Sequence, residues 1–342
     1  MRYAARRLLA VIPVVLALVT IVFLVMRWLP GSPASTLAAA GAGSASTSQI
    51  TASESQIQSA LGLNHPIGVQ YGRFLWQLVH LDLGTSFIGD NSVLGLLGQA
   101  LPATIELTIA AMFLATVIGS ITGILAAWRK DSVLDVFIRS GATVSFSLPW
   151  FALGVLGIVI FGVQLRLLPT IGRLPTSLNY TPTTGFVLID AVLQDRPELL
   201  GPWLQHLILP ATTLALSMAG YITRTVRAAV LEVRGDDFVR TARMKGLTER
   251  EIVVRHVLRN ASLPIVTVLG LQFGSLLGGA LITEVVFSYP GVGDLLVNAV
   301  LERDYPVVQG AALAIAALYT LVNVGVDLLY LVLDPRLRKA VA

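Results

Sequence analysis

Histidine and cysteine are the side chains to examine first for metal or nucleophilic chemistry, and the chain offers few of them. It has no cysteine, which excludes thiolate chemistry and disulfides. Its four histidines are far apart and show none of the spacings that hold a metal ion: His65, His80, His206 and His256. No Gly-rich loop is followed by the Lys-Ser or Lys-Thr pair that cradles nucleotide phosphates. The sequence therefore predicts no catalytic, cofactor-binding or metal-binding residue, and no binding of ATP by this chain.

Acidic and amide side chains inside long apolar runs are the remaining candidates, because each is costly in lipid and needs a reason. Glu106, Glu284 and Asp327 lie near the ends of such runs, where snorkelling or hydrogen bonding at a helix end accounts for them. A proton-coupled transporter would place acids near the middle of the membrane. We therefore favour a structural or gating role for these three acids. Gln272 lies deeper and is the best single candidate for lining a solute pathway.

Small residues in the fifth apolar run form a regular pattern. Gly270, Gly274 and Gly278 recur at intervals of four, which clears one face of a helix and lets a neighbour approach closely. We favour helix packing over direct contact with a solute. Gly274 and Gly278 remain pathway or gate candidates, because a closely packed face also transmits motion.

The composition places these residues in a membrane protein. The chain is 55% hydrophobic and only 13% charged, with a mean hydropathy of +0.76, outside the range of ordinary soluble domains. Six apolar runs reach the length of about 20 residues that crosses a bilayer, near 8–29, 101–127, 134–162, 206–226, 263–287 and 307–333. The first run exceeds the ~7–15 residues of a secretory signal core, so we interpret it as a retained span. The predicted fold class is an all-α membrane protein with six transmembrane helices.

The order of Lys and Arg along the chain predicts its orientation. Basic residues cluster at both ends, around Arg129–Arg139, and most densely from Arg224 to Arg259. Because basic loops stay on the cytoplasmic side, both termini and the segment 227–262 are expected to be cytoplasmic. This sidedness explains the net charge of +4 without a nucleic-acid partner.

Three regions follow along the chain. Residues 1–29 are a short tail and the first span, residues 30–98 form an extracytoplasmic loop region, and residues 99–342 form the core with the remaining five spans. Within the loop region, apolar residues from Val69 to Val79 predict an amphipathic helix that ends near Asp82–Gly84. Pro290, Gly291 and Gly293 mark a tight re-entrant-like turn between spans five and six.

The basic segment 227–262 reads as two short helices separated by a glycine. Asp236 or Asp237 is suited to cap the first helix, and Gly246 lies where a helix would end in a left-handed turn. Thr248, with Glu251 three residues later, offers a capping box to the second helix. A rigid helix–Gly–helix knob of this kind suits docking onto a soluble partner.

Charge alone would explain the basic residues of this segment but not its apolar ones. Phe238, Val239 and Ala242, with Met244 alongside, give the first helix an apolar edge, and Ile252, Val253 and Val257 do so for the second. The pattern predicts a docking surface, with polar contacts at its rim from Arg240, Arg243 and Lys245.

The segment resembles the "EAA" coupling loop of ABC-importer permeases, in particular the dipeptide/oligopeptide/nickel permease family and its first permease subunit type. Thr241, Ala242, Gly246 and Pro264 occupy the matching places. Arg240 replaces the Glu of the general motif, and the interval from Gly246 to Pro264 is longer than in sugar permeases. Both departures are usual in the peptide branch. Further strings resemble the same family in the same order, among them SFSLPWFALG, LPTIG, HLILPATTLAL, TEVVFSYPGVG and RDYPVVQG.

The resemblance implies a type I ABC importer permease fold and half of a translocation pathway for di- or oligopeptides in a bacterial inner membrane. The implied partners are a second homologous permease, one or two ABC ATPase subunits that hold ATP and Mg, an extracytoplasmic substrate-binding protein, the peptide and membrane lipid. The residues expected to couple to the ATPase are Asp237, Phe238, Arg240, Thr241, Ala242, Arg243, Lys245, Gly246, Leu247 and Glu251. Nickel, glutathione or haem import, an ion-coupled secondary transporter and a non-transporting scaffold remain as alternatives.

Overall fold

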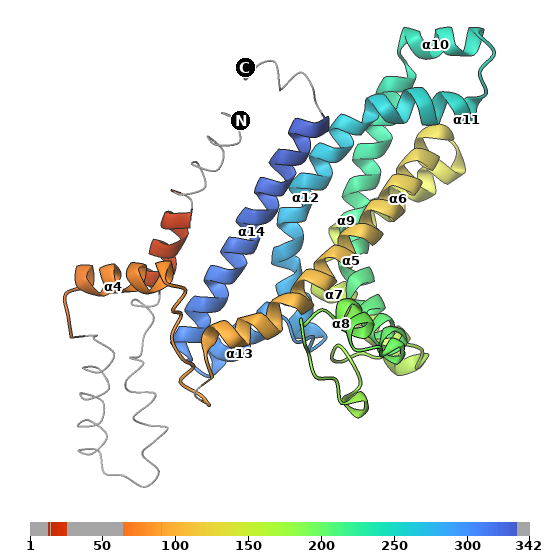
Figure 1. Ribbon diagram of the computed structural model, residues 1–342. Coiled ribbons are helices and arrows are strands. Elements are labelled where there is room, and N and C mark those ends of the chain that lie inside the picture. Colours follow the sequence, from red (N-terminus) through yellow and green to blue (C-terminus); the bar gives the residue numbers. More distant parts are fainter. Residues whose placement is uncertain (1–12, 14, 26–63, 90, 334–342) are drawn as a thin grey trace.

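A computed structural model describes residues 13, 15–25, 64–89 and 91–333 of the 342-residue chain, and its ordered elements are helices. Among the described residues, four helices are long and apolar enough to cross a membrane: α5 (Val93–Trp128), α9 (Leu200–Arg234), α12 (Leu258–Val286) and α14 (Tyr305–Leu333). They form an elongated bundle (Figure 1). The number of such spans in the described chain is five when a bent helix pair is taken as one span.

The first expected span, 8–29, lies only in part within the described residues, which include 13 and 15–25. Its described part is the short apolar helix Val15–Val25. The prediction of six spans therefore stays a prediction, whereas the membrane-spanning, all-helical class of the described chain is confirmed.

The third expected span, 134–162, is not one straight helix. It consists of α6 (Val133–Ser147), α7 (Trp150–Gly157) and the π-helical η1 (Ile158–Gln164), with a bend of 103° between α6 and α7. Pro149 causes the break, because it has no N–H to donate and it disfavours helical geometry at the residue before it. Leu148 is accordingly extended, with φ −86° and ψ 132°.

Helices α5 and α9 make the most extensive contact of the bundle. A Cβ atom added to Gly119 would lie 2.6 Å from the side chain of Ile222, and one added to Gly123 would lie 2.7 Å from that of Val226. The hydroxyls of Thr122 and Thr223 are 2.7 Å apart across the same contact. Small residues and paired hydroxyls are how membrane helices pack closely, so these glycines have a packing function.

The connecting elements lie at the two ends of the bundle. At one end are α10 (Asp237–Met244), α11 (Glu249–Glu251) and the π-helical η4 (Ile252–Val257). At the other are α8 (Val187–Leu193), the 3-10 turns at Thr176–Leu178 and Pro197–Leu199, and α13 (Val292–Leu301) (Figure 1). The amphipathic helix expected before span two is present as α4 (Ile67–Val79). The expected turn at 290–293 also begins a ten-residue helix, α13, which its Pro and Gly residues had concealed.

Candidate functional site

The segment 236–259, hereafter the elbow, projects from one end of the bundle as a helix, a sharp turn and a second helix (Figure 1). Gly246 has φ +78°, as the sequence predicts. Its N–H donates to the carbonyl of Arg243 at 3.0 Å, and the N–H of Leu247 donates to the carbonyl of Ala242 at 3.3 Å. These two bonds form a Schellman motif, which satisfies the last carbonyls of α10 and reverses the chain.

Side chains fix the second half of the turn. The backbone N–H of Glu251 donates to Thr248 Oγ1 at 3.3 Å, and the N–H of Thr248 donates to Glu251 Oε2 at 3.0 Å. This is the predicted capping box. Arg243 Nε donates to Glu249 Oε1 at 2.7 Å and thereby lowers the pKa of that carboxyl. The capping predicted for the first helix is wrong in one respect: Asp236 occupies the N-cap position, but its side chain makes no capping bond.

The structure divides the predicted docking residues into an inner and an outer set. Val239 and Ala242 are 0% and 5% exposed, and they pack with Ile252 and Val257 into the main apolar core. They hold the elbow together from inside. The outer set is exposed and consists of Asp237, Phe238, Arg240, Thr241, Arg243, Lys245 and Gly246, together with Met244, while Leu247 and Glu251 are half-buried.

At the elbow end of the bundle, two arginines of α9 form hydrogen bonds with neighbouring helices. The guanidinium of Arg234, at the end of α9, donates to the carbonyls of Ala127 and Trp128 at 3.0 and 3.2 Å. Arg227, two turns earlier on α9, donates twice to Asp135 of α6, at 2.8 and 2.7 Å. Asp135 is 0% exposed. Movement of the elbow is therefore linked through α9 to both α5 and α6.

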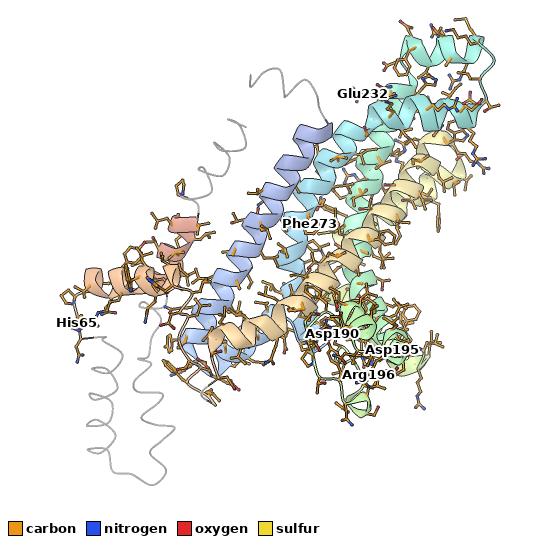
Figure 2. The ribbon with its side chains drawn as sticks, in the orientation of Figure 1. His65, Asp190, Asp195, Arg196, Glu232 and Phe273 are labelled. Carbon is orange, nitrogen blue, oxygen red and sulfur yellow. The ribbon has the colours of Figure 1, made fainter. Side chains whose placement is uncertain are left out.

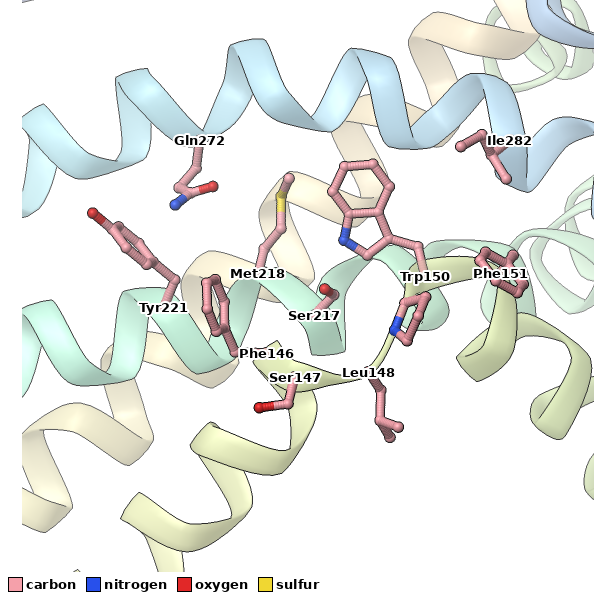
Figure 3. Close-up of a pocket in the computed structure, with 11 residues that line it drawn as sticks. Phe146, Ser147, Leu148, Trp150, Phe151, Ser217, Met218, Tyr221, Gln272 and Ile282 are labelled. Carbon is pink, nitrogen blue, oxygen red and sulfur yellow. The ribbon is translucent and has the colours of Figure 1, made fainter.

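A cavity of about 420 Å³ opens beside the break between α6 and α7 (Figure 3). Gln272 of α12 lines it, together with residues of α9 and of the break itself. The full lining consists of Phe146, Ser147, Leu148, Pro149, Trp150, Phe151, Ser217, Met218, Tyr221, Gln272 and Ile282. It contains no carboxylate and no basic side chain.

The glycines of α12 have separate surroundings. A Cβ atom on Gly274 would lie 2.9 Å from the ring of Tyr319 on α14, and one on Gly279 would lie 2.6 Å from the indole of Trp150 at the cavity. Gly278 has no described atom within 4 Å of such a position. Gly274 thus has the packing function that the spacing predicts, whereas Gly278 does not serve packing among the described residues.

Comparison with known proteins decides the family. A model described as "Binding-protein-dependent transport system inner membrane component" matches residues 119–339, and the N-terminal model of such membrane components matches residues 1–108. The chain belongs to this family. It is 38% identical to the dipeptide transport system permease protein DppB of Alkalihalophilus pseudofirmus over 98% of this chain and 99% of that protein. It is also 38% identical to DppB of Escherichia coli (strain K12), over 99% of each.

A solved structure shares the fold of this permease. An inward-facing methionine ABC transporter, MetNI, aligns with a TM-score of 0.54 at 19% identity, covering 70% of this chain and 96% of that one. At this identity the likeness concerns the fold alone. The fold of the permease is accordingly that of an ABC importer membrane subunit.

The end of the permease opposite the elbow holds two buried acids that the sequence places at span ends. Glu284 accepts a hydrogen bond of 2.6 Å from the N–H of Gly293, in the first turn of α13. A Cβ atom on Gly291 would lie 2.3 Å from the Glu284 carboxyl carbon, so only glycine fits there. Glu284 thus anchors α13, which agrees with the expectation of bonding at a helix end. The side chain of Asp327 lies outside those that the structure describes.

Glu106 is the centre of a second cluster at this end. Arg173 pairs with it at 2.5 Å, and both side chains are 8% exposed. The indole N–H of Trp203 and the backbone N–H of Val187 donate to the same carboxylate at 3.0 and 2.7 Å. Sequence reasoning did not find Arg173, and its single signal was an arginine inside the otherwise apolar string LPTIGRLP.

Asp190 organises the loop over this cluster, far from Glu232 at the elbow end (Figure 2). Burial of its carboxylate opposes ionisation, but hydrogen bonds from Tyr180 and Thr184, joined by the backbone N–H of Thr183, outweigh burial and lower the pKa of Asp190 to about 2. The carboxylate therefore stays charged and fixes the loop between η1 and α8.

Proposed function

We propose that this chain is one of two permease subunits of an ATP-driven importer and that its substrates are di- or oligopeptides. The observation that carries the proposal is the 38% identity to dipeptide permeases over almost the whole of both chains. In this proposal the chain crosses a bacterial inner membrane six times with both termini in the cytoplasm. Its partners are a second permease, one or two ATPase subunits and an extracytoplasmic binding protein.

The elbow is the proposed contact with an ATPase subunit. Its exposed surface combines apolar Phe238 and Met244 with Arg240 and Lys245, the mixture that a protein interface needs at its centre and rim. Its inside is packed and its turn is fixed by four hydrogen bonds, so it moves as one piece. ATP and Mg²⁺ belong to the partner, where ATP binding and hydrolysis drive the movement.

The elbow's movement reaches the cavity by a short route. Helix α9 continues from the elbow, holds α6 through Arg227 and Asp135, and carries Ser217 and Tyr221 into the cavity wall. A shift of α9 therefore moves α6 with it, and both helices contribute residues to the cavity lining. Alternating access follows if this movement opens the cavity to one side of the membrane at a time.

Reconstitution tests this proposal. The chain purified alone is expected to hydrolyse no ATP, and the complete assembly in liposomes is expected to accumulate peptide only when ATP is supplied. ATP turnover by the isolated chain, or peptide uptake driven by an ion gradient without any ATPase, would contradict it. Comparing di- and oligopeptides with nickel, glutathione and haem in the same liposomes identifies the substrate.

A further inference from the structure

The cavity beside the broken span contains backbone groups that no part of the described chain satisfies. Pro149 has no N–H to donate. Near the break, the N–H of Leu148 donates to the carbonyl of Val144, and the N–H groups of Ala152 and Leu153 donate to the carbonyl of Pro149. The carbonyls of Phe146 and Ser147 and the N–H groups of Trp150 and Phe151 make no hydrogen bond with any described residue. At membrane depth such groups are tolerated where they line a cavity, and all four residues do so.

Ser217 is the second, independent sign of a ligand. It is 5% exposed, and its hydroxyl makes no hydrogen bond with any described residue. The four threonines of the same helix behave differently, since each donates to the carbonyl four residues earlier: Thr212, Thr213, Thr223 and Thr225. The Ser217 hydroxyl instead points into the cavity, between Met218 and Trp150 (Figure 3). A hydroxyl that is open to the cavity and has no partner among the described residues is available to hydrogen-bond a ligand.

The remaining lining defines what that ligand is. Across the cavity, the side-chain amide of Gln272 faces Tyr221 and Phe146 (Figure 3) and has no hydrogen bond with a described residue. No charged side chain lines the cavity, so a charge held there would remain unpaired. The lining offers both donors and acceptors, and aromatic rings with the adaptable Met218 make up much of the rest. A neutral group with one donor and one acceptor, bearing side chains of varied shape, fits this lining.

We propose that this cavity binds an amide group of the transported peptide's backbone, while the charged ends of the peptide lie outside this uncharged lining. The free carbonyls of Phe146 and Ser147 accept from a peptide N–H, and the Ser217 hydroxyl and the Gln272 amide donate to a peptide carbonyl. The inference rests on the proposed peptide import and adds to it the place and the chemistry of recognition. Because the contacts are with the backbone, the site accepts peptides that differ in their side chains.

Cysteine labelling tests the site, because the chain has no cysteine of its own. Ser217→Cys and Gln272→Cys each introduce the single thiol of this subunit, and the complete importer is labelled with a thiol reagent during ATP turnover. A transported peptide is expected to slow labelling several-fold at either position. Leu216→Cys is the matched control, since Leu216 is the exposed neighbour of Ser217 on α9, and its labelling should not respond to peptide. Equal labelling with and without peptide at both test positions would overturn the site.

The backbone readout has its own test in the same preparation. Peptides with different side chains should protect the thiol equally, and a peptide methylated at its amide nitrogen, chosen so that the binding protein still binds it, should protect several-fold less. Equal protection by the methylated peptide would refute amide recognition. Peptide uptake is measured first on each preparation. Uptake without protection overturns only this inference, whereas absence of ATP-dependent uptake by the wild-type assembly overturns the proposed function instead.

Discussion

Gly246→Val is expected to abolish transport while the protein still inserts into the membrane. Gly246 has φ +78°, and no atom of the described residues lies within 4 Å of the position where a Cβ would be added. The effect therefore comes from the backbone and not from a clash. A left-handed conformation costs a non-glycine residue about 1–2 kcal/mol, and a β-branched side chain makes it less accessible still. Losing this turn would remove the Schellman motif and pull Val239 and Ala242 out of the core.

The control for this change is Gly246→Asn, because asparagine adopts the left-handed region more readily than other residues with a side chain. It should retain a substantial part of the activity. The measurement is peptide uptake per amount of permease in the membrane. Normal uptake by a well-expressed Gly246→Val protein would mean that the elbow's shape has no part in coupling.

Asp135→Asn is expected to have the second large effect, on both stability and transport. The carboxylate is 0% exposed and receives two hydrogen bonds from Arg227, so the change leaves a guanidinium that is 18% exposed without its counter-charge. Because the guanidinium keeps some contact with water, the expected loss of stability lies below the about 3–5 kcal/mol that is typical when a fully buried pair is broken. Since the pair joins α6 to α9, ATP hydrolysis by the assembled importer should become uncoupled from uptake. The midpoint of thermal unfolding measures the loss of stability, and the ratio of peptide transported to ATP hydrolysed measures the loss of coupling.

A neighbouring acid supplies the matched control. Asp131 lies four residues away, with its side chain 75% exposed and 3.9 Å from Lys130. Asp131→Asn should change stability by less than about 1 kcal/mol, as for exposed pairs generally. Exchanging the charges, with Asp135→Arg and Arg227→Asp together, should recover part of the coupling. Full coupling in Asp135→Asn would show that this pair does not carry movement from α9 to α6.

Features that depend on residues close together in the sequence could be predicted from it. The left-handed glycine at 246, the capping box of Thr248 and Glu251 and the amphipathic helix before span two each depend on residues within a turn or two. The bend at Pro149 was equally local, but the surrounding apolar run suggested one uninterrupted span. The proline of SFSLPWFALG was its signal, because a proline forces the residue before it out of the helix.

Features that depend on distant residues could not be predicted. Arg227 and Asp135 are 92 positions apart, and Arg173 and Glu106 are 67 apart. No local pattern pairs such residues, since the packing of α5, α6 and α9 brings them together. For the same reason the sequence could not separate buried Val239 and Ala242 from exposed Phe238 and Met244. It identified Gln272 from its polarity at depth, but not the cavity that surrounds it.

Site-specific cross-linking between the elbow and an ATPase subunit tests the central claim most directly. Met244→Cys places one thiol on the exposed outer surface of the elbow, where Met244 is 76% exposed, in a chain that otherwise has none. Leu193→Cys, exposed on α8 at the opposite end of the bundle, is the control. We predict that a short bifunctional reagent links position 244, but not position 193, to the ATPase, in a yield that changes when ATP is added. If the cysteine at position 244 is modified by the reagent in the active assembly but forms no cross-link to the ATPase, the account is contradicted.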